Sequence, residues 1–224
     1  MAQDERIDPN QRQNQGATPF YVACQNGHIE VVKYMMQDER IDVNQRQNQG
    51  VTPFYVACQN GHIELVKYMM QDQRIDVNGQ EDTNVHGTPF LVACQNGHIE
   101  VIKYMTQDQR IDINKPINEN ITPIWIGSYN GHIQVVQAIL QSGRQVNLDA
   151  KWTRNNKTAA EQARQNGHHE IAGLLEKYTK NPVETRKELD GKCKKRRSKR
   201  RRRRGRKGKI GEGQREARAE NRHQ

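Results

Sequence analysis

Cysteine and histidine recur four residues apart in the N-terminal half of the chain. Cys24, Cys58 and Cys94 are followed by His28, His62 and His98. Such pairs are typical of metal ligands, but one cysteine and one histidine per copy supply only two of the four ligands that structural zinc needs. If the copies pack as neighbouring helices do, about 10 Å apart, their cysteines also lie too far apart for a disulfide. We therefore predict small buried core residues here, with neither zinc nor a disulfide.

The sequence lacks the common signatures of catalysis. It contains no G-x-S-x-G, P-loop, H-E-x-x-H or glycine-rich phosphate-binding motif. Glu30, Glu64 and Glu100 recur once per copy, which is typical of a solvated face rather than of a paired acid and base. We predict that the protein is not an enzyme and uses no catalytic residue, cofactor, metal ion or small-molecule substrate.

These residues recur because a whole segment recurs. The segment TPFYVACQNGHIEVVKYM begins at Thr18, returns nearly unchanged at Thr52 and Thr88, and returns in weaker form at Thr122 and Thr158. The starts lie 34, 36, 34 and 36 residues apart, and one glycine keeps its register in every copy. A period of this length is typical of stacked-repeat architectures.

Each copy predicts two short helices and a hairpin. Thr18 followed by a proline is a typical helix start, so we expect a first helix over about 19–25 that ends at the turn residue Gly27. A second helix is expected over about 29–37, because apolar residues there recur at helical spacing. The stretch 41–50 mixes β-branched residues with turn formers and predicts an extended hairpin. Helices this short are marginal alone, so the copies must bury one another.

A helix, a glycine turn, a second helix and a hairpin, opened by Thr-Pro at a period near 33 residues, resemble the ankyrin repeat. The resemblance covers residues 4 to about 179 and implies an all-α solenoid of paired antiparallel helices with hairpin fingers. The histidine of the family's Thr-Pro-Leu-His signature is replaced here, by Tyr21, Tyr55, Leu91 and Trp125. The predicted divisions are a partial repeat and hairpin at 1–17, repeats at 18–51, 52–87, 88–121 and 122–157, a C-terminal capping repeat at 158–182, and a tail at 183–224.

The two ends of the array differ. The last copy carries polar residues where earlier copies are mostly apolar, which predicts the polar outer face of a cap; these are Glu161, Gln162, Arg164 and His169. No cap is visible at the other end, because residues 1–10 nearly repeat residues 35–44. We expect either a longer protein upstream, or an exposed face around Phe20 and Val22 that meets a partner, another copy or a loosely ordered N-terminus.

Partners of ankyrin proteins usually bind the concave surface made by the hairpin tips and the exposed side of the first helix. The resemblance therefore implies a scaffold or adaptor that binds an unknown protein. Amide side chains dominate the matching positions, with Tyr129 and Trp152 as aromatic anchors of the kind that dominate binding energy. Alternatively, the near-identical Gln-Asn pairs record recent duplication without selection for a ligand. The candidate partner-binding residues are Arg12, Asn14, Gln25, Arg46, Asn48, Gln59, His86, Gln95, Glu119, Tyr129, Trp152 and Arg154.

The net charge of +10 is unevenly distributed. Residues 1–182 hold 17 basic and 20 acidic side chains, a net −3, whereas residues 183–224 hold 19 and 6, a net +13. The sequence is only 33% hydrophobic, which disfavours one large core. It has no apolar run long enough to span a membrane and no secretory signal at its start. Four cysteines without a secretory context predict a reducing compartment, the cytoplasm or nucleus.

The tail is a polycation, since 14 of the 18 residues from Lys192 to Lys209 are basic and none is acidic. We predict that it is disordered. It resembles nuclear-import signals read by import receptors, and it would also bind nucleic-acid phosphates non-specifically or an anionic membrane surface; a tail without a selected role is the remaining alternative. A non-specific nucleic-acid-binding protein is thus the second functional prediction. The candidate residues are Lys194, Lys195, Arg196, Arg197, Lys199, Arg200, Arg201, Arg202, Arg203 and Arg204.

Overall fold

The computed structural model describes residues 8–79 and 87–191. Two compact units divide the chain, one ending at Lys180 and the other beginning at Asn181. The first unit contains the helix pairs and their fingers, and each unit is described by itself below.

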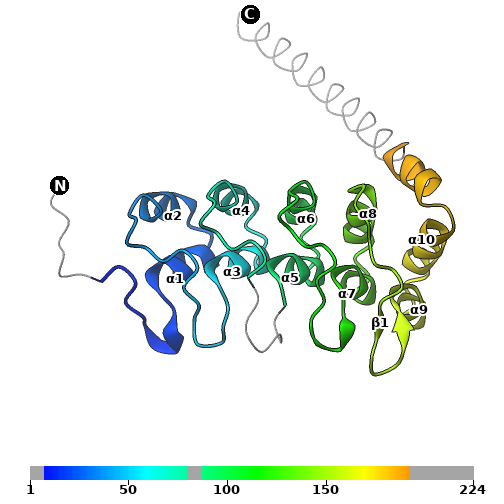
Figure 1. The fold of residues 1–224 in the computed structure, drawn as a ribbon, viewed down its shortest axis with the longest axis horizontal. Coiled ribbons are helices and arrows are strands. Elements are labelled where there is room, and N and C mark those ends of the chain that lie inside the picture. Colours follow the sequence, from blue (N-terminus) through cyan, green and yellow to red (C-terminus); the bar gives the residue numbers. More distant parts are fainter. Residues whose placement is uncertain (1–7, 80–86, 192–224) are drawn as a thin grey trace, which may run out of the picture. The chain divides into compact units, whose positions relative to one another are not determined.

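Five helix pairs, numbered here as repeats 1 to 5, follow one another along the described part of the first unit (Figure 1). The odd-numbered helices form one row and the even-numbered helices a second, with the fingers on the far side of the odd-numbered row (Figure 1). The predicted all-α solenoid of paired helices is confirmed. The pairs are α1 (Pro19–Gln25) with α2 (Ile29–Met35), α3 (Pro53–Gln59) with α4 (Ile63–Met69), α5 (Pro89–Gln95) with α6 (Ile99–Met105), α7 (Pro123–Tyr129) with α8 (Ile133–Gln141), and α9 (Ala159–Gln165) with α10 (His169–Lys180).

The threonine before each odd-numbered helix explains where that helix begins. Thr18 Oγ1 accepts a hydrogen bond from the backbone N–H of Tyr21 at 3.1 Å, and the proline that follows occupies the first helical position, where its missing N–H is not needed. The same cap forms at Thr52, Thr88 and Thr122. In repeat 5, which lacks the proline, Thr158 forms a reciprocal capping box with Glu161 instead.

The fingers differ from the extended hairpins that the sequence predicts. In repeats 1, 2 and 4 a backbone hydrogen bond across the base of the finger closes a tight turn, as from the N–H of Gln47 to the oxygen of Val51. Repeats 1 and 4 place a short 3-10 turn at the tip, η1 (Asn14–Gly16) and η2 (Asn118–Asn120). Left-handed residues such as Glu119 (φ 64) reverse the chain too sharply for strand pairing. Among the described fingers only the last is a two-stranded sheet, in which β1 (Lys151–Trp152) pairs antiparallel with β2 (Lys157–Thr158).

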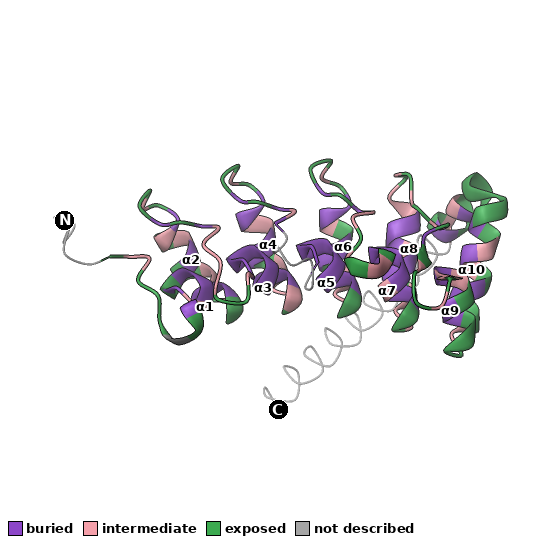
Figure 2. Cartoon of the chain, turned by 60° about the horizontal axis from the view of Figure 1, so that its bottom comes forward, coloured by how far each residue is buried: buried purple, intermediate pink, exposed green. Residues whose placement is uncertain are grey.

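The core is a set of columns that run through the helix pairs, so the copies bury one another as the sequence predicts. Buried residues follow both helix rows, whereas the loops after the even-numbered helices carry exposed tips (Figure 2). The sulfur column joins neighbouring repeats, because Cys24 Sγ lies 3.9 Å from Met69 Sδ and Cys58 Sγ lies 4.0 Å from Met105 Sδ. Met35, the first member of this column, is only half-buried, whereas Met69 and Met105 are fully buried.

The second unit corrects the predicted start of the tail. Residues 183–191, assigned by sequence to a disordered tail, belong to a helix that spans 182–191 in the described part of the chain. Asn181 Oδ1 accepts a hydrogen bond from the backbone N–H of Glu184 at 3.3 Å, and a proline occupies the first helical position. Asn-Pro therefore caps this helix in the same way as Thr-Pro caps the odd-numbered helices. The prediction of disorder further on, at 192–224, lies outside the described residues.

Candidate functional site

The turn between the helices of each pair is bonded to the repeat before it. Asn60 Nδ2 donates to the backbone oxygen of Gln25 at 2.8 Å, and His62 Nε2 lies 2.9 Å from the same oxygen. A carbonyl only accepts, so the imidazole must carry its proton on Nε2. The pattern recurs at Asn96 and His98, at Asn130 and His132, and at Asn166 and His168. We call these contacts the turn ladder.

In the first four turns the glycine is required for two reasons. Gly61 has φ +73, a left-handed conformation that favours glycine, and a Cβ on it would lie 2.5 Å from Nδ1 of His98 in the next repeat. The same arrangement occurs at Gly27, Gly97 and Gly131. Thus Asn, Gly and His of the recurring Asn-Gly-His sequence all serve stacking.

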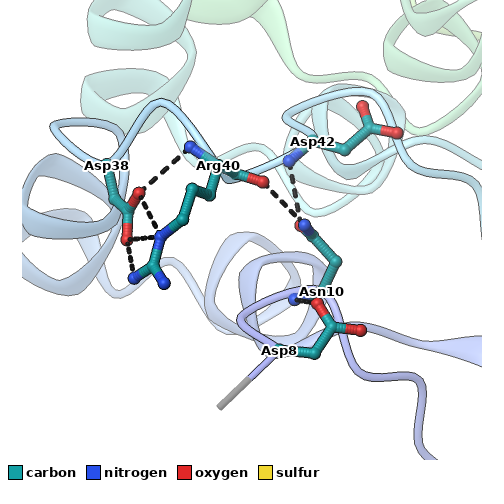
Figure 3. Close-up of polar contacts among 5 residues, drawn as sticks. All are labelled: Asp8, Asn10, Asp38, Arg40 and Asp42. Atoms are coloured by element: carbon teal, nitrogen blue, oxygen red, sulfur yellow. Dashed lines mark hydrogen bonds and ion pairs between the residues drawn. The ribbon is translucent and has the colours of Figure 1, made fainter. Parts of the chain in front are cut away.

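A second ladder joins the loops after the even-numbered helices. Asn10 Nδ2 donates to the backbone oxygen of Arg40 at 2.7 Å, and Asn10 Oδ1 accepts from the backbone N–H of Asp42 at 2.9 Å (Figure 3). One amide thereby satisfies two backbone groups of the next repeat. Asn44, Asn78 and Asn114 form the same pair of bonds with the repeats that follow them. We call these contacts the loop ladder.

Arginine and aspartate support the loop ladder. Arg110 donates to Asp108 and to the backbone oxygen of Met70 in the preceding repeat, the latter at 2.6 Å. The hydrogen bond from Arg110 holds the pKa of the Asp108 carboxyl below its usual value of 3.8. Arg74 likewise donates to Asp72 and to the backbone oxygen of Met36.

Repeats 4 and 5 carry a group of aromatic and charged residues that the first three repeats lack. Trp125, which is buried, packs against both Tyr129 and Trp152 with ring centroids 5.4 Å apart in each case, stacked on the tyrosine and edge-on to the tryptophan. Its indole N–H donates to the backbone oxygen of Lys157 at 3.2 Å. Tyr129 is 40% exposed. We call Trp125, Tyr129, Trp152, Glu119 and Arg154 the aromatic cluster.

Glu119 connects the fingers of repeats 4 and 5. Its carboxylate accepts from Trp152 Nε1 and from Arg154 Nε, both at 2.7 Å, and its backbone oxygen accepts from the N–H of Thr153. These donors, Trp152 first and then Arg154, lower the pKa of the Glu119 carboxyl. The Arg154 guanidinium also lies 5.9 Å from the Trp152 ring, while its side chain stays 69% exposed. The cluster therefore exposes the Tyr129 ring, which packs on Trp125, and the Arg154 guanidinium, which is bonded to Glu119.

A family model for ankyrin repeats in three copies matches residues 2–81, 42–117 and 90–186. The chain belongs to the ankyrin-repeat family. Ankyrin repeats are protein-protein interaction modules, and proteins built from them are in general non-enzymatic scaffolds. The chain has no match among the curated proteins.

In ankyrin terms, the aromatic cluster is built on an altered signature position. Trp125 stands where the family has the histidine of Thr-Pro-Leu-His, and its ring supports Tyr129 at the end of the same helix. Of the twelve predicted partner-binding residues, the described structure brings together Glu119, Trp152 and Arg154 by direct contact, with Tyr129 joined through Trp125. Sequence reasoning missed Trp125 because it is buried.

The other predicted partner-binding residues are spread over the finger tips and the ends of the odd-numbered helices. Arg12, Gln25, Asn48 and Gln95 are exposed, whereas Gln59 is half-buried and Arg46 is half-buried with a bond to the backbone oxygen of Gly50. The side chain of Asn14, His86 and the ten predicted tail residues lie outside what the structure describes. The described fingers and helix ends of repeats 1 to 3 thus form no cluster comparable to that of repeats 4 and 5.

Two residue assignments at the ends of the array were wrong. Gln162, predicted on the polar outer face, is 4% exposed, because its amide accepts from Asn155 and donates to Asn166. At the other end Phe20 is fully buried under its own repeat and does not form part of an exposed face.

The cysteines lie in the core, at the position that the sequence predicts. Cys24, Cys58 and Cys94 are buried free thiols, and burial raises the pKa of each thiol. A thiol that stays protonated is a poor nucleophile and metal ligand. Within 8–79 and 87–191, no group of three or more His, Cys, Asp and Glu side chains is placed to hold a metal ion. Every helix in these ranges is too short or too polar to cross a membrane.

Proposed function

We propose that this ankyrin-repeat protein is a non-enzymatic adaptor that binds a protein partner mainly through repeats 4 and 5. The aromatic cluster is the observation that supports this. Tyrosine, tryptophan and arginine are the residues that most often dominate binding energy, especially when their positions are fixed in advance. Tyr129 and Arg154 are exposed and held by Trp125, Trp152 and Glu119.

The equivalent surface of repeats 1 to 3 contributes less to this function. Its helix-end positions are Gln25, Gln59 and Gln95 in place of Tyr129. The asparagines beside them are bonded to neighbouring repeats through the turn ladder, apart from Asn26 at the first turn. Flexible glutamine side chains lose more conformational entropy on binding than a tyrosine ring does.

The proposal is tested by comparing two equivalent positions. Tyr129→Ala and Arg154→Gln should each weaken binding of a genuine partner by at least about tenfold, as expected for central contacts. Gln25→Ala, at the position equivalent to Tyr129, should change affinity less than about threefold. Partners are captured with the full chain, and the affinity of each variant for a captured partner is measured by calorimetry. Equal losses at Gln25 and Tyr129 would contradict the assignment to repeats 4 and 5.

The basic tail has a separate role in this proposal, which is to direct the protein to the nucleus or to add electrostatic affinity for its partner. The supporting observation is the run of arginines from Arg200 to Arg204 beside further lysines. The protein then works inside the cell, in the nucleus or the cytoplasm. Changing these five arginines to serine should leave a fluorescent fusion of the full chain in the cytoplasm. An unchanged nuclear fraction would remove the import role.

The second candidate function is non-specific nucleic-acid binding through the tail, which the same charge density favours. It predicts that the full chain binds single-stranded DNA with a steep salt dependence. The five-serine variant should then reduce the slope of log affinity against log salt by about 3. If the full chain binds DNA no better than the variant does across salt concentrations, this alternative fails.

A further inference from the structure

The finger of repeat 5, which carries β1 (Figure 1), is the most basic finger of the array. Its segment 151–157 holds three basic residues and no acidic residue, whereas the matching segments 11–17 and 45–51 hold one arginine each. Lys151, at the start of the segment, and Arg154, at its centre, are exposed in the structure. The last finger therefore presents positive charge to a partner.

The two carboxylates beside this finger are already bonded within the array. Glu119 accepts from Trp152 and from Arg154 through separate oxygens. Glu161 accepts from the backbone N–H and the hydroxyl of Thr158, and these bonds lower the pKa of its carboxyl. In the pair that Glu119 forms with Arg154, the arginine is the more exposed member, at 69% against 32%. The exposed charge of the pair is thus the positive one.

Arg154 keeps one edge of its guanidinium available. Its Nε donates to Glu119, while no residue in the described part of the chain accepts from its two Nη groups. The ring centroid of Trp152 lies 5.9 Å from the guanidinium carbon and restricts where the group can move. The two Nη groups form a planar fork, and a carboxylate matches such a fork with two parallel hydrogen bonds.

A chain of amides holds this finger against the end of α7. Asn155 Nδ2 donates to Gln162 at 2.8 Å, Gln162 Nε2 donates to Asn166 at 2.9 Å, and Asn166 Nδ2 donates to the backbone oxygen of Tyr129 at 3.0 Å. Because Arg154 precedes Asn155 directly, the exposed tyrosine ring and the guanidinium are held in a fixed relation. A partner that contacts both loses less conformational entropy than it would on a mobile surface.

We propose that the aromatic cluster binds an acidic segment of its partner protein. A carboxylate of that segment, from aspartate or glutamate, bonds to the Nη fork of Arg154, and an apolar side chain beside it packs on the exposed part of the Tyr129 ring. This inference rests on the proposed function and adds the chemical class of the partner. Charge complementarity supports it, since the carboxylate meets the three basic residues of segment 151–157.

Other occupants match the cluster less well. The basic tail of this chain, residues 183–224, has a net charge of +13 and is repelled by the last finger. A nucleic acid carries a phosphate at every nucleotide and gains affinity from successive stacked bases, whereas the cluster offers it one exposed ring, that of Tyr129, and one guanidinium fork.

The test begins with random 12-residue peptides displayed on phage. The peptides are depleted on the full-length Tyr129→Ala/Arg154→Gln variant, which removes peptides that bind the unchanged tail, and are then selected on the natural full chain. The selected peptides should share an aspartate or glutamate beside an apolar residue. Selected peptides without a shared acidic residue overturn the inference but leave the proposed function standing. If no peptide distinguishes the two chains, the proposed function fails as well.

A selected peptide then shows whether its carboxylate contacts Arg154. Changing that carboxylate to the amide should weaken binding to the natural chain about tenfold, but binding to the Arg154→Gln chain less than about twofold, because the contact is already absent there. Fluorescence anisotropy of the labelled peptide measures the four affinities. Equal losses on both chains would place the carboxylate elsewhere and overturn the inference.

Arg164→Gln provides the matched control, since it removes the same charge from repeat 5 outside the cluster. The Arg164 side chain is 54% exposed and paired with Glu176, so the substitution should change peptide affinity less than about twofold. Arg154→Lys, which keeps the charge but lacks the fork, should weaken binding at least about threefold. An equal loss at Arg164, or no loss with lysine, would show that only overall charge matters and overturns the inference.

Two further measurements decide between occupants. Binding of single-stranded DNA that Tyr129→Ala weakens about tenfold would assign the cluster to nucleic acid. Sedimentation that shows the natural chain to be a dimer separated by Arg154→Gln would assign it to a second copy. Either result overturns the inference, whereas DNA binding unchanged by Tyr129→Ala and a natural chain without such a dimer agree with it.

Discussion

Repeats 1 to 3 and repeats 4 and 5 share one backbone plan but differ in how their side chains are used. In the first three, recurring Asn, His and Arg side chains bond one repeat to the next, apart from those at the first turn, and the turn glycines leave room for the histidines. In the last two, the turn ladder continues, and the aromatic cluster is added on the fingers and on α7. Stacking explains most of the residues that the repeats have in common. Residues that differ between repeats are therefore the better candidates for contacting a partner.

The largest expected effect comes from removing the centre of the aromatic cluster. Trp125→Ala should lower the free energy of unfolding by about 3–5 kcal/mol, because a buried indole is lost and the Lys157 carbonyl loses its donor. Trp152 is then the only tryptophan in the chain, and its fluorescence should shift to longer wavelength as water reaches it. Urea denaturation followed by fluorescence measures both effects. A loss below about 1 kcal/mol would show that the cluster is not supported from beneath.

The turn glycines offer a comparison between an inner turn and the last one. Gly61→Ala should lower stability by about 3 kcal/mol, because it adds a clash with His98 to the strain of a left-handed alanine. Gly167 has φ +83, but no described atom lies within 4 Å of the place that a Cβ would take there, so Gly167→Ala should lower stability by only about 1–2 kcal/mol. Equal losses in urea denaturation would mean that backbone strain alone accounts for the glycines.

The turn-ladder histidines allow the same residue to be tested with and without its acceptor. His98→Ala should lower stability by about 1 kcal/mol, because Nε2 bonds to the Gln59 carbonyl at 2.7 Å. His28→Ala, at the equivalent position of repeat 1, should change stability by less than about 0.5 kcal/mol. Thermal unfolding of the two variants at pH 8 gives the comparison. A larger loss at His28 would contradict the description of the turn ladder.

The smallest expected effect concerns the ion pair that supports the loop ladder. The pKa of Asp108 is lowered in the folded state by the bond from Arg110, so this carboxylate stabilises the fold above its unfolded value near 3.8, and the stabilisation is lost as pH falls through the folded pKa. Because Arg110 is partly exposed, Asp108→Asn should cost only about 0.5 kcal/mol at pH 7. Urea midpoints should differ at pH 7 and converge near pH 2. A difference independent of pH would exclude the ion pair as its cause.

Much of the fold could be predicted because its signals are local. The Thr-Pro caps, the turn glycines and the apolar spacing of the second helices each follow from neighbouring residues, and the structure has these features at the expected positions. The ladders could not be predicted from one repeat, since Asn44 and His62 bond to backbone atoms more than 29 residues away. The only sign of the ladders in the sequence is that the same asparagines and histidines recur in every copy. Such recurrence is equally typical of a binding surface or of recent duplication.

The errors share a physical cause. Gln162 was predicted at the surface because its side chain is polar. The sequence did not indicate that Asn155 and Asn166 would form hydrogen bonds with its amide in the interior. The helix at 182–191 was missed because the high charge of the tail outweighed its Asn-Pro start. The aromatic anchors were recognised from residue type, whereas their attachment to Trp125 depends on the packing of α7 against the last finger.

The methionines of the sulfur column differ in how easily an oxidant can reach them. Met69 and Met105 are fully buried against cysteine sulfur in the preceding repeat, so an oxidant reaches them only when the repeats open. Met35 has the same place in its helix but is half-buried in the closed array. Conversion of a methionine to its polar sulfoxide disrupts apolar packing. Met35 should therefore be oxidised first. Oxidation of Met69 and Met105 should follow only in molecules whose repeats have separated.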